Sequence, residues 1–419
     1  MDSKIVVVGQ GYVGLPLALE ATRAGLTVTG LDLNQGTVGG LNSGKSHVDD
    51  VSDSDIAQML ESGYKASSDP SVISGADTVV ICVPTPLGEA SKPDLAAVIG
   101  ATKSIAQYMM PGTLVVLEST TYPGTTDDLI LPLLEAGGLQ VDVDFHLAFS
   151  PERIDPGNPI YGLKNTPKVV GGVTPASTAR AVAFYSSVVD VVVPVRGAKE
   201  AETAKLLENT YRHINIALVN EMSRFCHELG IDLWNVIDAA STKPFGFQAF
   251  YPGPGVGGHC IPIDPNYLSY EVKRKLGVPF RFVELAEEVN GSMPKYVVER
   301  LQDALNERQK ALNGASVLLL GVTYKKNIAD QRESPAIPVG ELLKGKGAVL
   351  SFHDPKVQTW TLGDSAIERV LDLNDAVENA DAVVLMQNHE SYDVDALASK
   401  AALFFDTRGV TTTEEAIRL

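Results

Sequence analysis

One stretch near the start of the chain decides the fold, and it reads Ile5-Val6-Val7-Val8-Gly9-Gln10-Gly11-Tyr12-Val13-Gly14. The β-branched apolar run predicts a short buried strand, and the glycines that follow have the spacing Gly-x-Gly-x-x-Gly. Residues 15–24 predict a helix, in which Pro16 is tolerated because it lies in the first turn. The order of strand, glycine turn and helix indicates the start of a doubly wound α/β domain.

A second predicted strand, residues 27–31, ends at Asp32, near the distance of about 20 residues expected of a dinucleotide-binding unit. In such a unit Gly9 makes a tight turn, Gly11 lets a pyrophosphate approach, and Gly14 packs the helix closely. Asp32 would bind the adenosine ribose and repel a 2′-phosphate, so we predict NAD rather than NADP as the cofactor. The alternative is a plain turn between a strand and a helix, which the acid at this position makes less favoured.

Polar groups follow three more predicted strands in the first third of the chain. Residues 76–83, 113–118 and 145–149 are apolar runs typical of parallel strands. Ligands bind at the carboxyl edge of such sheets, so we expect a site there. Either Thr120 or Ser150 alone would be an ordinary helix N-cap. The candidate residues after these strands are Pro84, Thr85, Ser119, Thr120, Ser150, Glu152 and Arg153.

The composition limits the classes of protein and partner. With 419 residues, of which 44% are hydrophobic and 21% charged, the chain predicts two or three globular domains. A formal net charge of −18 argues against nucleic acid or an anionic membrane as a partner. No apolar run is long enough to span a bilayer. His213 and His227 have no partner at metal-ligand spacing, so we expect no metal and interpret both as surface or interface residues.

The three cysteines, Cys82, Cys226 and Cys260, are odd in number and far apart, which argues against a disulfide framework or a zinc site. Reduced thiols indicate a cytoplasmic protein. Cys82 falls inside a predicted strand and is expected to be inert core. Cys260 falls in a loop rich in glycine and proline, residues 251–265, with Asp264 four residues later. The residues alone leave two interpretations open, a stiff turn with an incidental thiol or a nucleophile held in place.

The middle of the chain predicts one long helix over residues 200–230, about 45 Å in length. Such a helix could join two domains or form a dimer interface, and we expect a homodimer. Lys205, Asn209 and Arg212 fall on one stripe of it, which is usually a solvated face. Asn209 is a poor helix former with nothing to cap, so it and Lys205 are candidates to point into a site.

The last third of the chain again alternates strands with helices, which predicts a second parallel sheet. Its strands are expected at 316–320, 348–352, 382–385 and 403–405. No Gly-x-Gly-x-x-Gly opens this part, so we do not expect a second dinucleotide site. Cations at the predicted strand ends could hold a diphosphate, although solubility would explain any one of them. These cations are Lys325, Lys326, Arg332 and Arg408.

Over essentially its whole length the chain resembles the UDP-glucose/GDP-mannose dehydrogenase family. The motifs that carry the resemblance are Gly9–Gly14 with Asp32, Val83-Pro84-Thr85-Pro86, Glu118-Ser119-Thr120, Ser150-Pro151-Glu152, Lys205 with Asn209, Gly257-Gly258-His259-Cys260 with Asp264, and Lys325-Lys326 through Asp330-Gln331-Arg332-Glu333-Ser334. The resemblance implies a four-electron oxidation, in which the C6 hydroxyl of a nucleotide sugar becomes a carboxylate and two NAD are reduced.

We therefore expect an α/β chain of two doubly wound, Rossmann-like domains joined by a central helical region with one long helix. The expected domains are 1–195, which binds NAD, 196–305, which is helical and carries the thiol loop, and 306–419, which binds the UDP-sugar. The resemblance is also what makes a dimer through the long helix and a role in polysaccharide biosynthesis expected.

The resemblance further implies catalytic roles. Cys260 would capture the aldehyde, and Glu152 would act as general base for hydrolysis of the thioester. Asp264 and Lys205 would handle the water and the developing oxyanion, and Asn209 would assist Lys205. This is physically coherent, because a nearby cation favours a thiolate and stabilises negative charge at a tetrahedral centre. The rival is a catalytically silent nucleotide-sugar-binding protein, and the presence of Cys260, Lys205 and Glu152 argues against it.

The same resemblance implies two sets of contacts, and it gives Thr120 a further role in orienting the water. The cofactor set is Gly9, Gly11, Tyr12, Val13, Gly14, Asp32, Pro84, Thr85, Thr120 and Arg332. The substrate set is Glu152, Arg153, Lys205, Asn209, Tyr251, Gly257, Lys325, Lys326 and Arg408.

The stretch 241–265 is similar to the UDP-N-acetylglucosamine 6-dehydrogenase branch of the family. Two departures separate it from the UDP-glucose branch, which usually has a lysine where this chain has Ile263 and a second acid where it has Pro156. We expect UDP-N-acetylglucosamine as the substrate. UDP-N-acetylmannosamine, which differs only in configuration at C2, is a close alternative, and UDP-glucose is less favoured.

Overall fold

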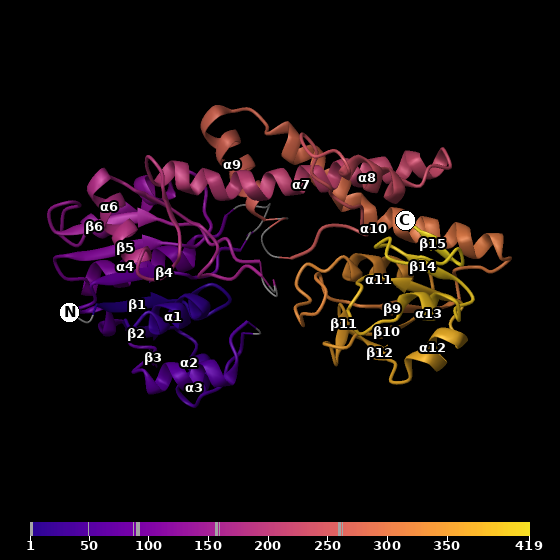
Figure 1. Cartoon of the computed structure of the whole chain (residues 1–419), viewed down its shortest axis with the longest axis horizontal. Coiled ribbons are helices and arrows are strands. Elements are labelled where there is room, and N and C mark those ends of the chain that lie inside the picture. Colours follow the sequence, from indigo (N-terminus) through magenta and orange to yellow (C-terminus); the bar gives the residue numbers. More distant parts are fainter. Residues whose placement is uncertain are drawn as a thin grey trace. The chain divides into compact units, whose positions relative to one another are not determined.

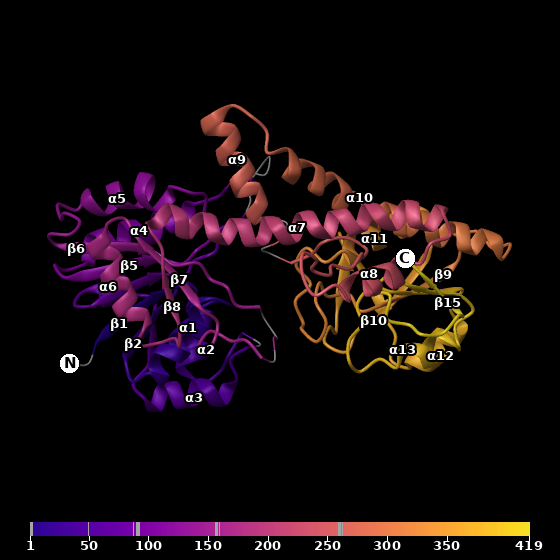
Figure 2. The same cartoon turned by 45° about the horizontal axis from the view of Figure 1, so that its top comes forward.

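The computed structural model describes residues 3–48, 50–86, 88, 93–155, 158, 160–258, 261 and 263–419. The chain divides into two compact units, one of residues 1–208 with 266–278 and one of residues 209–265 with 279–419. Each unit contains a sheet with helices packed beside it (Figure 1 and Figure 2). The two Rossmann-like sheets and the helical central region confirm the fold predicted from the sequence. The expected boundaries at 195 and 305 stay a prediction.

The first unit is built on a sheet whose order is β3-β2-β1-β4-β5-β6-β7-β8. Strands β1 to β6 pair in parallel, β7 is antiparallel to β6, and β8 is parallel to β7. The strands are β1 (Lys4–Val8), β2 (Thr27–Leu31), β3 (Lys65–Ser67), β4 (Thr78–Ile81), β5 (Thr113–Leu117), β6 (Phe145–Phe149), β7 (Lys168–Gly172) and β8 (Val192–Pro194). The helical segments are α1 (Gly14–Arg23), α2 (Gln35–Asn42), α3 (Asp53–Glu61), η1 (Pro70–Ile73), α4 (Ala96–Tyr108), η3 (Thr126–Ile130), α5 (Leu131–Glu135) and α6 (Pro175–Tyr185).

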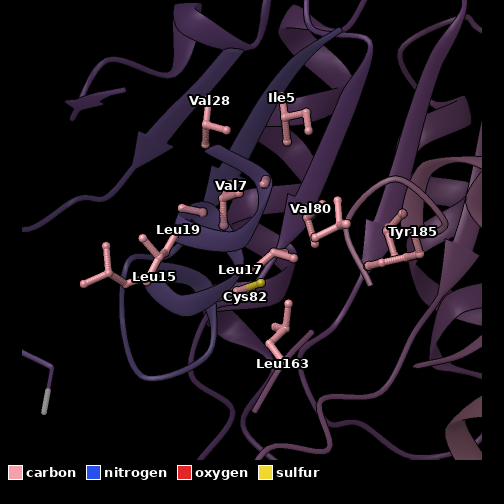
Figure 3. Close-up of a cluster of buried hydrophobic side chains, with 14 of the residues drawn as sticks. Ile5, Val7, Leu15, Leu17, Leu19, Val28, Val80, Cys82, Leu163 and Tyr185 are labelled. Atoms are coloured by element: carbon pink, nitrogen blue, oxygen red, sulfur yellow. The ribbon is translucent and has the colours of Figure 1, made fainter. Parts of the chain in front are cut away.

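Both faces of this sheet are covered, which explains the unbroken apolar run in β1. Ile5 and Val7 belong to one buried cluster, whereas Val6 and Val8 belong to another, as the alternation of side chains along a strand requires. Cys82 lies in the first cluster, where Figure 3 shows its sulfur beside Leu17. Cys82 is buried, which confirms that it is a core cysteine, and burial raises the pKa of its thiol well above its usual value.

The second unit contains a sheet of order β11-β12-β10-β9-β13-β14-β15. The strands run parallel except for β11, which is antiparallel to β12. They are β9 (Ser316–Leu320), β10 (Val349–His353), β11 (Trp360–Leu362), β12 (Ser365–Arg369), β13 (Ala382–Leu385), β14 (Phe404–Asp406) and β15 (Ala416–Arg418). Its helices include α8 (Leu233–Ser241), α10 (Arg281–Glu307), α11 (Ala336–Gly345), α12 (Leu373–Asn379) and α13 (Val394–Ala398).

Two helices contain residues of both units, α7 (Ala198–Glu228) and α9 (Asp264–Leu276). The long helix predicted over residues 200–230 is therefore confirmed as α7. In the part of the chain that the structure describes, no helix is both long enough and apolar enough to cross a membrane.

The prediction that His213 is a surface or interface residue is wrong. His213 is 1% exposed, and its Nε2 lies 3.6 Å from Glu287 Oε2, too far for a good hydrogen bond. Burial lowers the pKa of His213 to about 4, so the ring is neutral near pH 7. His227, in contrast, is exposed as expected.

The polar, glycine-rich composition of residues 39–52 predicts a surface loop, and this prediction is wrong for the first of these residues, because they belong to α2. Asn34 is the N-cap of α2, and its side chain accepts hydrogen bonds from the N–H groups of Gly36 and Thr37. This N-cap offsets the poor helix propensity of the glycines in α2.

Candidate active site

The glycine turn joins β1 to α1 at the carboxyl edge of the first sheet, and two of its glycines are required by packing. Gly9 has a φ of +91°, and a Cβ on it would lie 2.5 Å from Cys82 O. A Cβ on Gly14 would lie 1.9 Å from Gly9 O. Gly11 differs, because a Cβ there would meet no heavy atom within 4 Å. The turn is thus closed against the protein and open at Gly11, where a pyrophosphate would need access.

Asp32 is held at the end of β2 by the backbone. Its Oδ2 accepts the N–H of Gln10 at 2.9 Å, and its Oδ1 accepts the N–H of Asn34 at 2.9 Å. The carboxylate therefore lies directly beside the glycine turn. An open glycine at a helix N-terminus and a fixed acid on the neighbouring strand fit a dinucleotide, the first holding the phosphates and the second the ribose.

The other expected cofactor residues of the first unit differ in exposure. Tyr12 is 36% exposed, Val13 is half-buried, and Pro84 is exposed after β4. Thr85 is buried, and its carbonyl accepts a hydrogen bond from the hydroxyl of Tyr267 at 2.8 Å. Their contacts with the cofactor stay predictions.

Lys205 and Glu152 are brought together in the first unit. Lys205 is buried on α7, and its Nζ donates to the carbonyl oxygen of Glu152 at 2.6 Å. Glu152 Oε1 accepts the N–H of Ile154, whereas Oε2 is buried and has no hydrogen-bond partner among the described residues. A buried carboxylate oxygen left in this way is costly unless a ligand or water completes it.

Lys168 and Tyr185 lie near this group, and no sequence motif indicated them. Lys168 Nζ lies 2.9 Å from Glu118 Oε2 in a fully buried ion pair, and the hydroxyl of Tyr185 donates to Glu118 Oε1. Burial raises the pKa of Glu118, Lys168 opposes the rise, and the charge of Glu152 adds to it. Glu118 was identified only as part of a motif, and the structure shows that its partners come from β7 and α6.

Arg153 turns toward protein partners, because its guanidinium pairs with Glu208 Oε1 at 2.8 Å and donates to Pro167 O at 2.6 Å. Thr120, which follows β5, is half-buried. The expected roles of these two residues toward a ligand stay predictions.

In the second unit, Asn209 meets Asp264. Asn209 Nδ2 donates to Asp264 Oδ2 at 2.5 Å, and Asp264 is the first residue of α9. A carboxylate is favoured at a helix N-terminus, and the amide accounts for an asparagine inside a long helix. Lys205 lies one turn before Asn209 on α7. Cys260, His259 and Pro262 lie outside the described residues.

The segment that leads to Cys260 is packed tightly at its glycines. A Cβ on Gly257 would lie 2.6 Å from Glu333 O and 2.8 Å from Pro335 Cδ. Gly258 has a φ of +87°, and a Cβ there would lie 2.8 Å from the ring of Tyr324. Only glycine fits these positions without a shift of backbone or ring. Tyr251, at the start of the segment, stacks on Trp234 with 5.8 Å between ring centroids.

The cations expected to bind a diphosphate have different surroundings. Lys325 is half-buried. Lys326 is exposed and lies 3.7 Å from Glu390, and Arg332 is exposed and pairs with Asp330 at 2.6 Å. Burial lowers the pKa of Arg408 to about 10, so it keeps its charge near pH 7. Its Nε donates to Met386 O at 2.7 Å, and a Cβ on Gly253 would lie 3.3 Å from Nη1.

A dinucleotide turn with a fixed acid, together with a second doubly wound domain bearing cations, fits a nicotinamide-dependent dehydrogenase. The chain belongs to the UDP-glucose/GDP-mannose dehydrogenase family. It matches that family's NAD binding domain at residues 3–189, its central domain at 199–292 and its UDP binding domain at 318–413. It is therefore one of the NAD-dependent UDP-sugar dehydrogenases, its cofactor is NAD, and its C-terminal domain is the UDP-binding one.

Individual relatives cover nearly the whole chain. It is 34% identical to a UDP-N-acetyl-D-mannosamine dehydrogenase of Methanocaldococcus jannaschii, over 99% of this chain and 94% of the relative. It is 36% identical to a UDP-N-acetyl-D-glucosamine 6-dehydrogenase of Pseudomonas aeruginosa, over 85% of this chain and 83% of the relative. The solved structure of a UDP-N-acetylmannosamine dehydrogenase from Pyrococcus horikoshii superposes with a TM-score of 0.89 at 31% identity. The superposition covers 99% of this chain and 98% of that structure.

Two glycine variants separate cofactor binding from folding. We predict that Gly11→Ala leaves the thermal unfolding temperature unchanged within about 2 °C, because its Cβ meets no protein atom. It should weaken NAD binding at least about tenfold, since the methyl group occupies the path of the pyrophosphate. Gly14→Ala should instead lower the unfolding temperature strongly, because its Cβ overlaps Gly9 O. Calorimetry and NAD titration measure both effects, and full NAD affinity in Gly11→Ala would contradict the assignment.

Proposed function

We propose that the protein oxidises the C6 hydroxyl of UDP-N-acetylglucosamine to the carboxylate, with loss of four electrons, through a thioester on Cys260. The observation that carries this proposal is the group around Glu152. Its carbonyl holds the ammonium of Lys205, and its Oε2 is buried without a hydrogen-bond partner in the described part of the chain. Hydrolysis of a thioester needs a base for the water and a cation for the oxyanion, and this group supplies one of each.

The proposed steps balance in atoms and electrons. NAD, when bound, supplies the hydride acceptor for each of the two oxidations. The alcohol loses its hydroxyl proton to solvent and a hydride from C6 and becomes an aldehyde. The Cys260 thiolate then adds to the carbonyl carbon and forms the thiohemiacetal anion. Loss of the second hydride gives the thioester. Water then attacks, Glu152 takes its proton, and the carbon–sulfur bond breaks to release the carboxylate and the thiol.

The remaining residues are proposed to position these groups. Lys205 stabilises the oxyanion of each tetrahedral centre, and Thr120 orients the water. Asp264 shares in handling the water and is fixed by Asn209. Cys260 itself lies outside the described residues, so its role rests on its place in the loop and on the family.

Ligand contacts are proposed for the sets named from the sequence. Lys325, Lys326 and Arg408 are proposed to neutralise the diphosphate, and Arg408 is supported because it is charged, largely buried and near Gly253. The NAD set comprises Gly9, Gly11, Tyr12, Val13, Gly14, Asp32, Pro84, Thr85, Thr120 and Arg332. Glu152, Arg153, Lys205, Asn209, Tyr251 and Gly257 complete the proposed substrate set.

The choice of sugar is supported by the stretch 241–265 and by the Pseudomonas relative. UDP-N-acetylmannosamine is a second candidate, because the Methanocaldococcus and Pyrococcus relatives carry that name. Ile263 argues against UDP-glucose, as does Pro156, which lies outside the described residues. An N-acetylated UDP-hexosamine is common to both leading candidates, and the acid formed is proposed to serve polysaccharide biosynthesis.

Oxidation through a thioester fixes the yield of reduced cofactor. We predict about two NADH for each UDP-N-acetylglucosamine consumed, because the captured aldehyde cannot leave before the second oxidation. Absorbance of NADH measures the yield, and UDP-N-acetylmannosamine, UDP-glucose and GDP-mannose in parallel assays identify the preferred sugar. A yield of one NADH with free aldehyde in solution would contradict the thioester route.

The matched control is Cys260→Ala, which removes only the nucleophile. It should form no acid, whereas NAD binding through Gly9–Gly14 should keep the affinity of the unaltered protein. Acid formation at the full rate in this variant would show that Cys260 is not the nucleophile.

We also propose that the chain forms a homodimer through α7. Four large side chains on this helix are 47% to 64% exposed: Leu207, Tyr211, Leu218 and Phe225. At 3.6 residues per turn their positions fall within about 40° of one another, so they form one apolar stripe. A continuous apolar stripe of this kind favours association.

Sedimentation velocity tests the dimer. The unaltered chain should sediment with twice the mass of one chain. Leu218→Glu should sediment as a monomer, because dimer formation would bury the glutamate's charge in the stripe. Arg212→Glu, which lies off the stripe and is exposed, is the matched control and should remain dimeric. A monomeric unaltered chain at micromolar concentration would refute the proposal.

A further inference from the structure

Two segments of the second unit are tied together at the edge of its sheet. Residues 321–327 follow β9 and carry Lys325, and residues 387–390 follow β13, which pairs with β9. Gln387 Nε2 donates to Tyr324 O at 2.9 Å, and the N–H of Glu390 donates to Asn327 Oδ1 at 3.0 Å. The first segment is thus held at its centre and at its end by the second.

His389 makes the buried part of this connection. It is 2% exposed, and its Nδ1 accepts the N–H of Asn327 at 2.9 Å. Because Nδ1 is an acceptor, the neutral ring carries its proton on Nε2. Nε2 lies 3.1 Å from Asp354 Oδ2 and 3.3 Å from Thr323 Oγ1. The histidine therefore bridges a fixed carboxylate and the segment 321–327.

Asp354 is the fixed residue to which His389 is bound. It is 0% exposed, and it follows β10. Its oxygens accept the N–H groups of Val322 at 2.8 Å, Lys356 at 2.8 Å and Val357 at 3.1 Å. A carboxylate with this many backbone donors cannot rotate, so the ring of His389 is fixed as well.

The backbone of the tied segment needs support of this kind. Asn327, the last residue of the segment, has a φ of +66°, in the left-handed region that residues other than glycine rarely adopt. Such residues persist where the surroundings determine them, and they gather at ligand sites. Asn327 is held on both sides, by His389 through its backbone and by Glu390 through its side chain.

The same segment touches the thiol loop. A Cβ on Gly258 would lie 2.8 Å from the ring of Tyr324, and a Cβ on Gly257 would lie 2.8 Å from Tyr324 Cβ. Tyr324 is next to Lys325 in the chain. One short segment therefore presents a cation to the expected diphosphate and packs against the residues that lead to Cys260.

We propose that His389 is a positioning residue for UDP-sugar binding. Anchored on Asp354, it holds the segment 321–327 so that Lys325 and Tyr324 keep their places. Nothing in the family assignment gives His389 this role. The part of the inference that concerns the thiol loop rests on the proposed function, whereas the part that concerns UDP rests on the UDP-binding domain.

Each of two substitutions of His389 keeps one of its hydrogen bonds and removes the other. In His389→Asn the amide oxygen falls near the place of Nδ1 and can accept from Asn327, while the bond to Asp354 is lost. In His389→Gln the amide nitrogen reaches the place of Nε2 and can donate to Asp354, while the N–H of Asn327 loses its acceptor. The pair thus tests the tie to the segment separately from the burial of a polar side chain.

Calorimetric titration with UDP alone is the measurement. We expect His389→Gln to bind UDP at least about tenfold more weakly, and His389→Asn about threefold more weakly, because His389→Asn keeps the acceptor for Asn327 and loses only the anchor on Asp354. NAD affinity should change less than about threefold in either variant, since Arg332, the one proposed NAD contact in the second unit, lies outside the segment 321–327. Equal UDP affinities for both variants, weak or strong, would overturn the proposal, as would a parallel loss of NAD binding.

A second variant guards against misfolding of the histidine variants. Gln387→Leu removes the donor to Tyr324 O and leaves His389 in place, so UDP binding should weaken about threefold while calorimetry still shows one cooperative unfolding transition. Unaltered UDP affinity there would also overturn the proposal. The two hypotheses fail separately, because the absence of any UDP-sugar oxidation would contradict the proposed function while the UDP titrations still decide the role of His389.

Discussion

Parallel pairing with an even register is the constraint on which the rest of this structure depends. Val8 of β1 lies opposite Leu31 of β2 and opposite Ile81 of β4, so the residues after these strands leave the sheet at one level. This brings Asp32 to the glycine turn. The second sheet repeats the arrangement, with Leu320 opposite His353 and Leu385, and it brings His389, Asp354 and Thr323 together. Both ligand edges follow from strand register rather than from any one motif.

Charge is distributed unevenly between the surface and these edges. The chain carries a formal net charge of −18, yet Lys205, Lys168 and Arg408 are withdrawn from solvent at or beside the candidate sites. Each cation is held by a carbonyl or a carboxylate, which is what makes its burial tolerable. An anionic nucleotide sugar would therefore meet fixed positive charge on a chain whose overall charge repels it.

The sequence predicted well what depends on local pattern. The glycine turn, the main parallel strands and α7 were predicted because apolar runs and glycine spacing determine them. The partners of buried polar groups were not, because packing of distant segments decides them. His213 looks like a surface residue on a polar helix, and Lys168, Tyr185 and His389 have no signature around them. Among the expected site residues, Lys205 with Glu152 and Asn209 with Asp264 lie together, whereas Arg153 and Arg332 face protein carboxylates.

The central claim is that Glu152 serves the hydrolysis of a thioester on Cys260. Glu152→Gln keeps an oxygen for the N–H of Ile154 and removes the base. When this variant is mixed with NAD and UDP-N-acetylglucosamine, intact-protein mass spectrometry followed by peptide mapping should find the sugar acyl group on Cys260. Hydroxylamine should release it, as it does thioesters. Hydrolysis at the full rate with no adduct on Cys260 would contradict the account.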